Sequence, residues 1–275
     1  MSAALGRLPN APLAYVLAQV RFEPFLEIEK HIPALQTSLR AHYPRFRRFE
    51  RVGFEVLLTE AAPLPQVQPM PSSVHWEFGT AANFEGVMVQ PHSLVFHVTA
   101  YETYEQFGQA WLWVMRQVGA HIPELFVNRI GLRYVDFIVP NPDETPEDYV
   151  VDRLRCDPAL GRIPCQHHQG LTLAEYRLET GFLAVRYSRG MGRPTLPPDL
   201  SELSLQPSAI MQRVVADHQP TAVLDIDRFM ALSAAYDAEA LAEQFGKMHE
   251  ETSAVFKALT TDHARAVWKN VALPA

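Results

Sequence analysis

Hydrophobic positions in the first half of the chain switch between two periods, which predicts strands interleaved with helices. Residues 13–22 are apolar at nearly every position up to Gln19, as expected for a central strand of a sheet. From Leu26 to His42, apolar residues recur every three or four positions, which predicts a helix with one buried face and an irregularity at Pro33. The other elements expected in this half are strands at 48–60, 74–78, 84–90 and 94–99, a proline-rich loop at 61–73 and an amphipathic helix at 103–121.

The second half of the chain opens with another strand-like segment at 126–139. A linker rich in Pro, Asn and Asp follows it and leads into a short helix expected at 146–156. The dipeptide Thr180-Gly181 predicts a hairpin between strands at 169–180 and 182–188. The remaining elements are an irregular insertion at 190–208, a second hairpin of strands 210–216 and 221–229, and a helix from the N-cap Asp237 to Leu259.

Both halves therefore predict the order strand, helix, four strands and long helix, in residues 13–121 and again in 127–259. An antiparallel sheet with this order leaves one face free to be covered by its helix. We expect an α+β protein of two tandem units, 1–125 and 126–275, whose curved antiparallel sheets are each backed by a long helix. Pairing through residues 126–139 would join them into one continuous sheet. The repeat lies in the pattern of elements and not in residue identity.

Composition narrows the classes of partner. The chain has 275 residues, of which 48% are hydrophobic, enough to bury a sizeable core. Its 24 basic side chains are outnumbered by 31 acidic ones, and the net charge of −7 disfavours a protein that binds nucleic acid through phosphate contacts.

The two cysteines and the hydropathy pattern bear on the compartment. Cys156 and Cys165 have no zinc-type spacing, and so few cysteines are more typical of a reducing compartment than of a secreted domain. The first residues lack the apolar core of a signal peptide, and no apolar run reaches the ~18 residues that a membrane span requires. We therefore expect a cytoplasmic protein that does not enter a membrane.

Catalytic motifs are absent from the sequence. It contains no nucleophile elbow, phosphate-binding loop, dinucleotide glycine fingerprint, zinc spacing or kinase signature. Because catalytic groups can also assemble from distant segments, this lowers the odds of an enzyme without excluding one. We expect no cofactor and no metal.

Charged residues on the predicted strands form the first group of candidate site residues. Asp225 and Asp227 lie two apart, so their carboxylates point to the same face of a strand, where paired acids can hold Mg²⁺ or share a proton. Salt bridges to Arg21, Arg129 or Arg133 on adjoining strands would explain the same residues, and we favour this interpretation. The three arginines could alternatively clamp an anion.

A second group consists of arginines with interleaved aromatic residues between positions 40 and 51, of which Arg45, Arg47 and Arg48 are the central members. They could hold phosphate, a nucleotide, an acidic partner or RNA, since guanidinium groups bind oxyanions and stack on rings. They could equally be a solvated helix end that complements the helix dipole. Trp113 falls off the core face of its predicted helix, so it either contacts the second unit or anchors a partner.

Three segments of the sequence form a recognisable set: PLAYVLAQVRF at 12–22, NRIGLRYV at 128–135, and LDIDRF at 224–229 followed by Met248-His249 and Phe256. Together they resemble a sporadically distributed family of uncharacterised bacterial proteins of about this length, and RIGLRY is the most specific of them. The resemblance covers essentially the whole chain. It implies no activity, cofactor or catalytic residue. The patchy occurrence of the family suits an accessory or defence-type gene context.

These observations favour a non-catalytic binding or adaptor protein that recognises a protein partner through the seam between its units and through its proline-rich loops. The alternative is a protein that binds a small anion or nucleotide in a cavity of the curved sheet, with hydrolysis assisted by Asp225 and Asp227.

Overall fold

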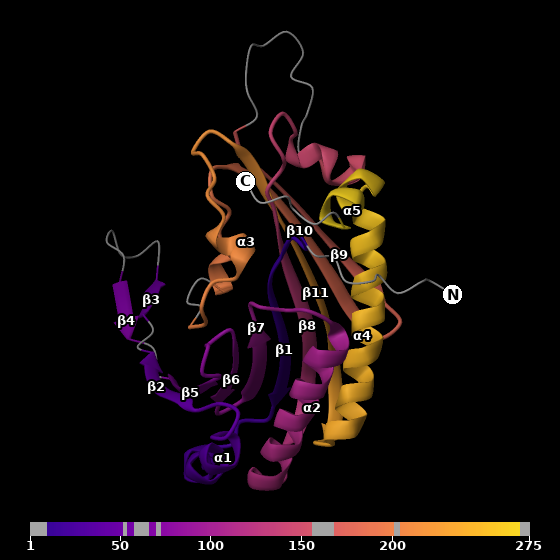
Figure 1. Cartoon of the computed structure of the whole chain (residues 1–275). Coiled ribbons are helices and arrows are strands. Elements are labelled where there is room, and N and C mark those ends of the chain that lie inside the picture. Colours follow the sequence, from indigo (N-terminus) through magenta and orange to yellow (C-terminus); the bar gives the residue numbers. More distant parts are fainter. Residues whose placement is uncertain are drawn as a thin grey trace.

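A computed structural model describes residues 10–51, 54–57, 66–69, 73–155, 168–200 and 204–269. Most of them build one nine-stranded sheet in which neighbouring strands are antiparallel (Figure 1). A separate two-stranded ladder lies beside β2 at the left of Figure 1 and consists of β3 (Phe54–Leu57) and β4 (Gln66–Pro69). In spatial order the strands of the large sheet are β2 (Arg45–Arg51), β5 (Ser73–Gly79), β6 (Glu85–Gln90), β7 (Ser93–Val98), β1 (Leu13–Phe22), β8 (Phe126–Ile138), β11 (Pro220–Ala235), β10 (Gly181–Met191) and β9 (Gly170–Leu178).

Helices cover one face of this sheet. The two longest, α2 (Tyr104–His121) and α4 (Ala238–Leu259), lie side by side, and α1 (Ile32–Leu39) packs against α2 (Figure 1). None of the helices in the described ranges is long and apolar enough to cross a membrane. The shorter helices are α3 (Ala209–Gln212), α5 (Asp262–Lys269) and the 3₁₀ turns η1 (Ile28–His31), η2 (Pro146–Asp148), η3 (Asp152–Leu154) and η4 (Pro198–Leu200).

The central strands β1 and β8 separate the two faces of the sheet by simple alternation. On β1, Val16 and Ala18 point to the helices and belong to the largest core cluster. Tyr15 and Leu17 point to the opposite side, where they pack in a smaller apolar cluster. β8 is paired along its length with β1 on one side and β11 on the other, so strands from both halves of the chain belong to one continuous sheet.

The largest core cluster lies between the sheet and the helices and draws on both halves of the chain. Trp111 of α2 and Phe245 of α4 are almost fully buried and meet edge to face, with 5.3 Å between their ring centroids. Leu35 and Leu39 of α1 belong to the same cluster. Because α4 comes from the second half and α1 and α2 from the first, the two halves share one core.

The opposite face of the sheet, here called the helix-free face, has a different cover. Residues 192–200 and 204–217, which include α3, cross the upper part of it (Figure 1). Leu205 packs there in the same cluster as Tyr15 and Phe137. Alternation along the strands also places polar and charged side chains on this face.

The hairpin predicted at Thr180-Gly181 is confirmed as the connection between β9 and β10. Gly181 has φ of +93°, a conformation that side-chain-bearing residues rarely adopt. A Cβ at this position would lie 2.4 Å from the carbonyl oxygen of Phe229, so the adjacent strand also requires glycine here. The turn therefore fixes the register of the outermost strand.

The first half departs from the expected elements in two places. Pro33 does not kink a continuous helix; it lies in the first turn of α1, where proline is tolerated because no intrahelical N–H is needed, and η1 precedes it. The strand expected at 48–60 is wrong in its bounds, since β2 begins at Arg45 and β3 is a separate strand. β4 falls within the proline-rich segment expected to be a loop, and residues 58–65 and 70–72 lie outside the described residues.

The second half departs more strongly. The strand predicted at 210–216 is wrong, because this segment contains α3 and irregular chain, and β11 pairs with β8 and β10 instead. The helix expected at 146–156 consists of η2 and η3 as far as the structure describes it. α5 was not expected. Among the described residues, three strands follow β8 instead of four, so the predicted order of this unit does not hold.

Candidate functional site

A network of ion pairs lies on the helix-free face, centred on Asp225. Arg133 donates two hydrogen bonds to its carboxylate, from Nε to Oδ1 at 2.7 Å and from Nη2 to Oδ2 at 2.8 Å. Arg186 on β10 donates to the same Oδ2 at 3.2 Å and lies 4.0 Å from Asp227. Arg133 also donates to Asp199 of η4, with 3.3 Å between Nη2 and Oδ1. The favoured interpretation of Asp225 as an ion-pair partner of Arg133 is therefore confirmed.

The electrostatics of this network follow from burial and pairing. Asp225 is 1% exposed and Arg133 7% exposed, so neither charge is well hydrated. Burial acts to lower the pKa of Arg133, but hydrogen bonds to Asp225 and Asp199 outweigh it and raise that pKa above its ordinary value. The hydrogen bond from Arg133 lowers the pKa of Asp199, and burial raises that of Asp227. The oxygens of Asp225 are thus engaged by arginines, which leaves little capacity for a metal.

Arg21 and Arg129 also lie on the helix-free face, but neither forms an ion pair with a described carboxylate. They lie directly opposite each other in the ladder of β1 and β8. Arg129 donates to Gln19 Oε1 at 3.1 Å and lies over the ring of Phe229 at 4.5 Å from the centroid. Arg21 is exposed. The anion clamp expected from three arginines is therefore divided, since Arg133 is neutralised and the other two are not.

A second polar cluster lies at the far side of the same face, and the sequence analysis did not find it. Glu77 on β5 is 6% exposed and lies 3.4 Å from both Arg47 Nη2 and His75 Nε2. The hydroxyl of Tyr15 and Nδ1 of His97 share a hydrogen bond of 2.8 Å. Burial lowers the pKa of His97 to about 4, so this imidazole is neutral at pH 7. The sequence could have indicated this cluster, because alternation along the strands places these side chains on the face away from the helices.

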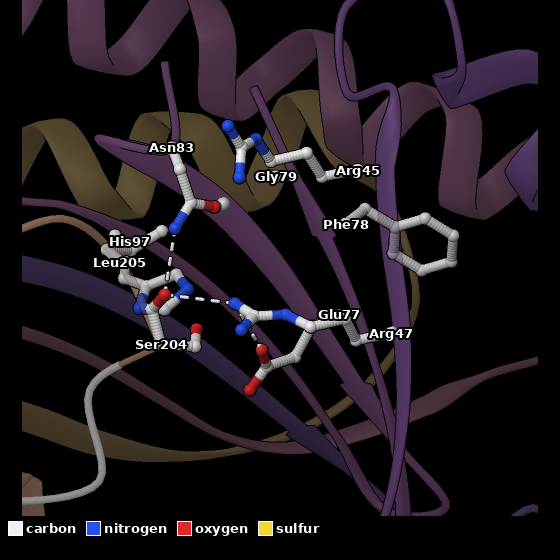
Figure 2. A pocket seen from close by; sticks show the side chains of 10 residues that line it. Arg45, Arg47, Glu77, Phe78, Gly79, Asn83, His97, Ser204 and Leu205 are labelled. Atoms are coloured by element: carbon white, nitrogen blue, oxygen red, sulfur yellow. Dashed lines mark hydrogen bonds and ion pairs between the residues drawn. The ribbon is translucent and has the colours of Figure 1, made fainter. Parts of the chain in front are cut away.

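The hollow lined by Arg47, Glu77 and His97 is too small for an organic ligand (Figure 2). Its volume is about 10 Å³, roughly the space that one water molecule requires. The carbonyl of Ser204 closes it, accepting hydrogen bonds from Arg47 at 2.9 Å and from Asn83 at 2.8 Å. A Cβ on Gly86 would approach His97 Nε2 to 2.9 Å, so glycine keeps the wall close.

The arginines of β2 have separate partners and do not form one patch. Arg45 donates to the carbonyl of Ala81 at 2.9 Å, on the same side of the strand as Arg47. Arg48 points to the other side, where Glu29 and Glu50 lie 3.7 and 3.9 Å away. All three belong to a strand and not to a helix end, so the interpretation as a helix C-terminus is wrong for them.

Trp113 contacts its own half of the chain. Its ring centroid lies 4.6 Å from that of His42 and 6.1 Å from that of Tyr43, two residues that follow α1. These ring contacts join α2 to the end of α1, and the two alternatives for Trp113, contact with the second unit and anchoring of a partner, stay predictions.

The outermost strand β9 presents the most exposed apolar surface of the sheet. Leu171 and Leu173 are 69% and 63% exposed and point to the same side, and Tyr176 is 47% exposed on the other. β9 pairs with β10 along one side, and no strand among the described residues pairs with its outer side.

The fold and this polar face define an α+β protein with a curved antiparallel sheet, helices on one face and paired charges on the other. No protein-family model, curated protein or solved structure matches the chain. In the part of the chain that the structure describes, no three His, Cys, Asp or Glu side chains are grouped as metal ligands.

Asp136 provides a pH-dependent prediction. It is 3% exposed on the helix side of β8, and burial, with a contribution from the charge of Asp225, raises its pKa to about 8. Because the folded pKa lies above the ordinary value of 3.8, the fold favours the neutral acid; this stability is fully present below about pH 4 and is lost as the pH rises to 8.

We expect Asp136→Asn to gain stability relative to the wild type between pH 5 and pH 8, by at most about 1.4 kcal/mol per pH unit. Urea unfolding of both proteins at the two pH values measures this difference. A gap between the two proteins that stays constant with pH would contradict it.

Proposed function

We propose that this protein is a non-catalytic binding or adaptor protein and that an extended segment of a protein partner adds to the outer edge of β9. The observation that carries the proposal is the exposure of Leu171 and Leu173 on a nine-residue edge strand. Along such an edge, alternate residues point backbone N–H and C=O groups outward, where they can pair with another strand. Natural sheets usually protect long apolar edges, and an edge strand that no other described strand covers suits a partner.

The polar face supports a binding role over a catalytic one. A catalytic carboxylate must be able to reach a substrate, but Asp225 is buried and held by two arginines. The hollow beside Glu77 has room for about one water molecule. These contacts support a role for the charged groups in attaching Asp199 and Ser204 to the sheet.

The edge is a better location for the partner than the seam between the two halves. The seam, β1 against β8, lies in the middle of the sheet, and helices cover it on one face. On the other face its upper part is covered by the cluster around Leu205. A cytoplasmic setting and an accessory gene context remain part of the proposal, as does the resemblance that suggested the latter.

We also propose that the chain is a tandem duplication. In each half the first strand lies beside the last one, β1 beside β7 and β8 beside β11, and a long capped helix follows. Superposition of the halves in an experimental structure should place β7 on β11 and α2 on α4. A best fit that matches other strands would contradict the duplication.

The partner proposal is tested with charge placed on the edge. We expect Leu171→Lys/Leu173→Lys to weaken recovery of a stoichiometric partner from the native host at least about tenfold, because lysines disfavour strand addition at an edge. Quantitative mass spectrometry after affinity capture measures the recovery. Val214→Lys is the matched control, since Val214 is 93% exposed away from β9.

Deuterium exchange of the reconstituted complex provides the second readout, with protection expected along β9. Two results would count against the proposal: equal recovery with the edge variant and the wild type, or no stoichiometric partner for the wild type.

A further inference from the structure

The helix-free face contains a pair of like charges in direct register. Arg21 on β1 is opposite Arg129 on β8. Like charges at such positions destabilise a sheet unless something neutralises them. In the described ranges no carboxylate lies within 4 Å of either guanidinium, whereas Arg133, farther along the same strand, is paired with Asp225 and Asp199. The pair therefore differs from Arg133 and Arg186, which have acidic partners on the same face.

The charged side chains around Arg21 and Arg129 do not balance, because arginines outnumber aspartates. The network contains four arginines, at positions 21, 129, 133 and 186, and three aspartates, at positions 199, 225 and 227. The aspartates lie closer to Arg133 and Arg186 than to the other two arginines. Asp227 interacts electrostatically with Arg129, but the two do not form an ion pair within 4 Å. The excess therefore falls at the end of the network where Arg21 is exposed.

The guanidinium of Arg129 is held in place. Gly131 lies between Gln19 and Phe229 in the sheet register, and Arg129 contacts the side chains of both. Its guanidinium therefore lies over the space that Gly131 leaves on the sheet. A donor group already fixed by an amide and an aromatic ring loses little freedom when it binds an anion.

We propose that Arg21 and Arg129 form a binding site for a phosphate group. Two guanidinium groups offer several N–H donors to one tetrahedral oxyanion, and their combined charge matches a phosphate better than a single carboxylate. Arg129 is the fixed half of the site and Arg21 the solvent-exposed half. The site is separate from the β9 edge and does not depend on the partner proposed there.

Two probes distinguish a free phosphate from a phosphate carried by a protein. Isothermal titration at constant ionic strength is carried out with inorganic phosphate and with a phosphoserine peptide of otherwise neutral sequence. Saturable binding of either probe supports the site. Saturation by inorganic phosphate indicates a small-molecule ligand, and saturation by the peptide alone indicates a phosphorylated chain.

The variants test whether the two arginines are responsible. We expect Arg129→Gln and Arg21→Gln each to weaken binding at least about tenfold, and Arg129→Lys to weaken it as well because lysine cannot bind in the bidentate manner. Arg40→Gln, which removes an exposed arginine beyond α1, should leave affinity unchanged. Thermal melts verify that each variant is folded; Arg21 is exposed, so Arg21→Gln remains informative if Arg129→Gln does not fold.

The outcomes that overturn the site are distinct from those that bear on the edge of β9. Absence of saturable binding by both probes would remove it. So would an affinity that is the same in Arg21→Gln/Arg129→Gln as in the wild type.

Discussion

Replacing Asp225 by alanine is expected to destabilise the fold by about 3–5 kcal/mol, because it leaves the buried guanidinium of Arg133 without its principal partner. Asp199 cannot compensate, since its side chain is 62% exposed and engages Arg133 from the outer side only. Arg186 also loses its closest acceptor. Equilibrium unfolding in urea, followed by circular dichroism, measures the loss.

Two controls separate the buried pair from the charges around it. Asp199→Ala should cost less than about 1 kcal/mol, as is usual for an exposed partner. Arg133→Met/Asp225→Leu removes both buried charges and should recover most of the stability lost in Asp225→Ala. If Asp225→Ala is no less stable than Asp199→Ala, the ion pair is not the element that holds this face.

Part of this site was predictable from the sequence. Alternation along a strand places Asp225 and Asp227 on one face, and the facing arginines were identified as partners, which is correct for Arg133. Arg186 was missed because its contact depends on β10 being the neighbour of β11, and strand order is not encoded in periodicity. Asp199 was missed because it reaches Arg133 from an irregular segment that has no period to follow.

The wrong elements have physical reasons as well. The apolar run from Ile210 is short enough to form either a strand or a turn of helix. In the structure it forms a turn of helix that packs onto the helix-free face. Pro33 lies in the first turn of α1 and not in its interior, a distinction that depends on where the helix starts and that apolar periodicity alone does not define. The long helices were predictable because their apolar periodicity runs over many turns and their caps, Thr103 and Asp237, are explicit.

The two faces of the sheet stabilise the protein by different means. On the helix side, apolar contacts join α1, α2 and α4, so elements far apart in sequence depend on one core. On the helix-free side, an ion pair joins Asp199 to Arg133 of β8, and a hydrogen bond joins the Ser204 carbonyl to Arg47 of β2, whereas Arg21 has an exposed charge. A change on the helix side should therefore affect global stability, whereas a change at Arg21 should affect binding alone.

Phe245→Ala is expected to cost about 3–5 kcal/mol and to lower the stability of both halves together. Phe245 is fully buried in the second half and packs edge to face on Trp111 of the first half, at 5.3 Å between centroids. Because the helices share one core, tryptophan fluorescence and far-ultraviolet circular dichroism should report a single coincident transition in both the wild type and the variant.

Phe126→Ala is the matched control for loss of a phenyl ring, since Phe126 is 45% exposed, and it should change stability by less than about 1 kcal/mol. Two separate transitions in the wild type, with Phe245→Ala shifting only one of them, would show that the halves fold as independent domains. Coincident transitions would instead mean that α4 contributes to the first half of the chain as much as to its own, because the α2–α4 contact is formed across the two halves.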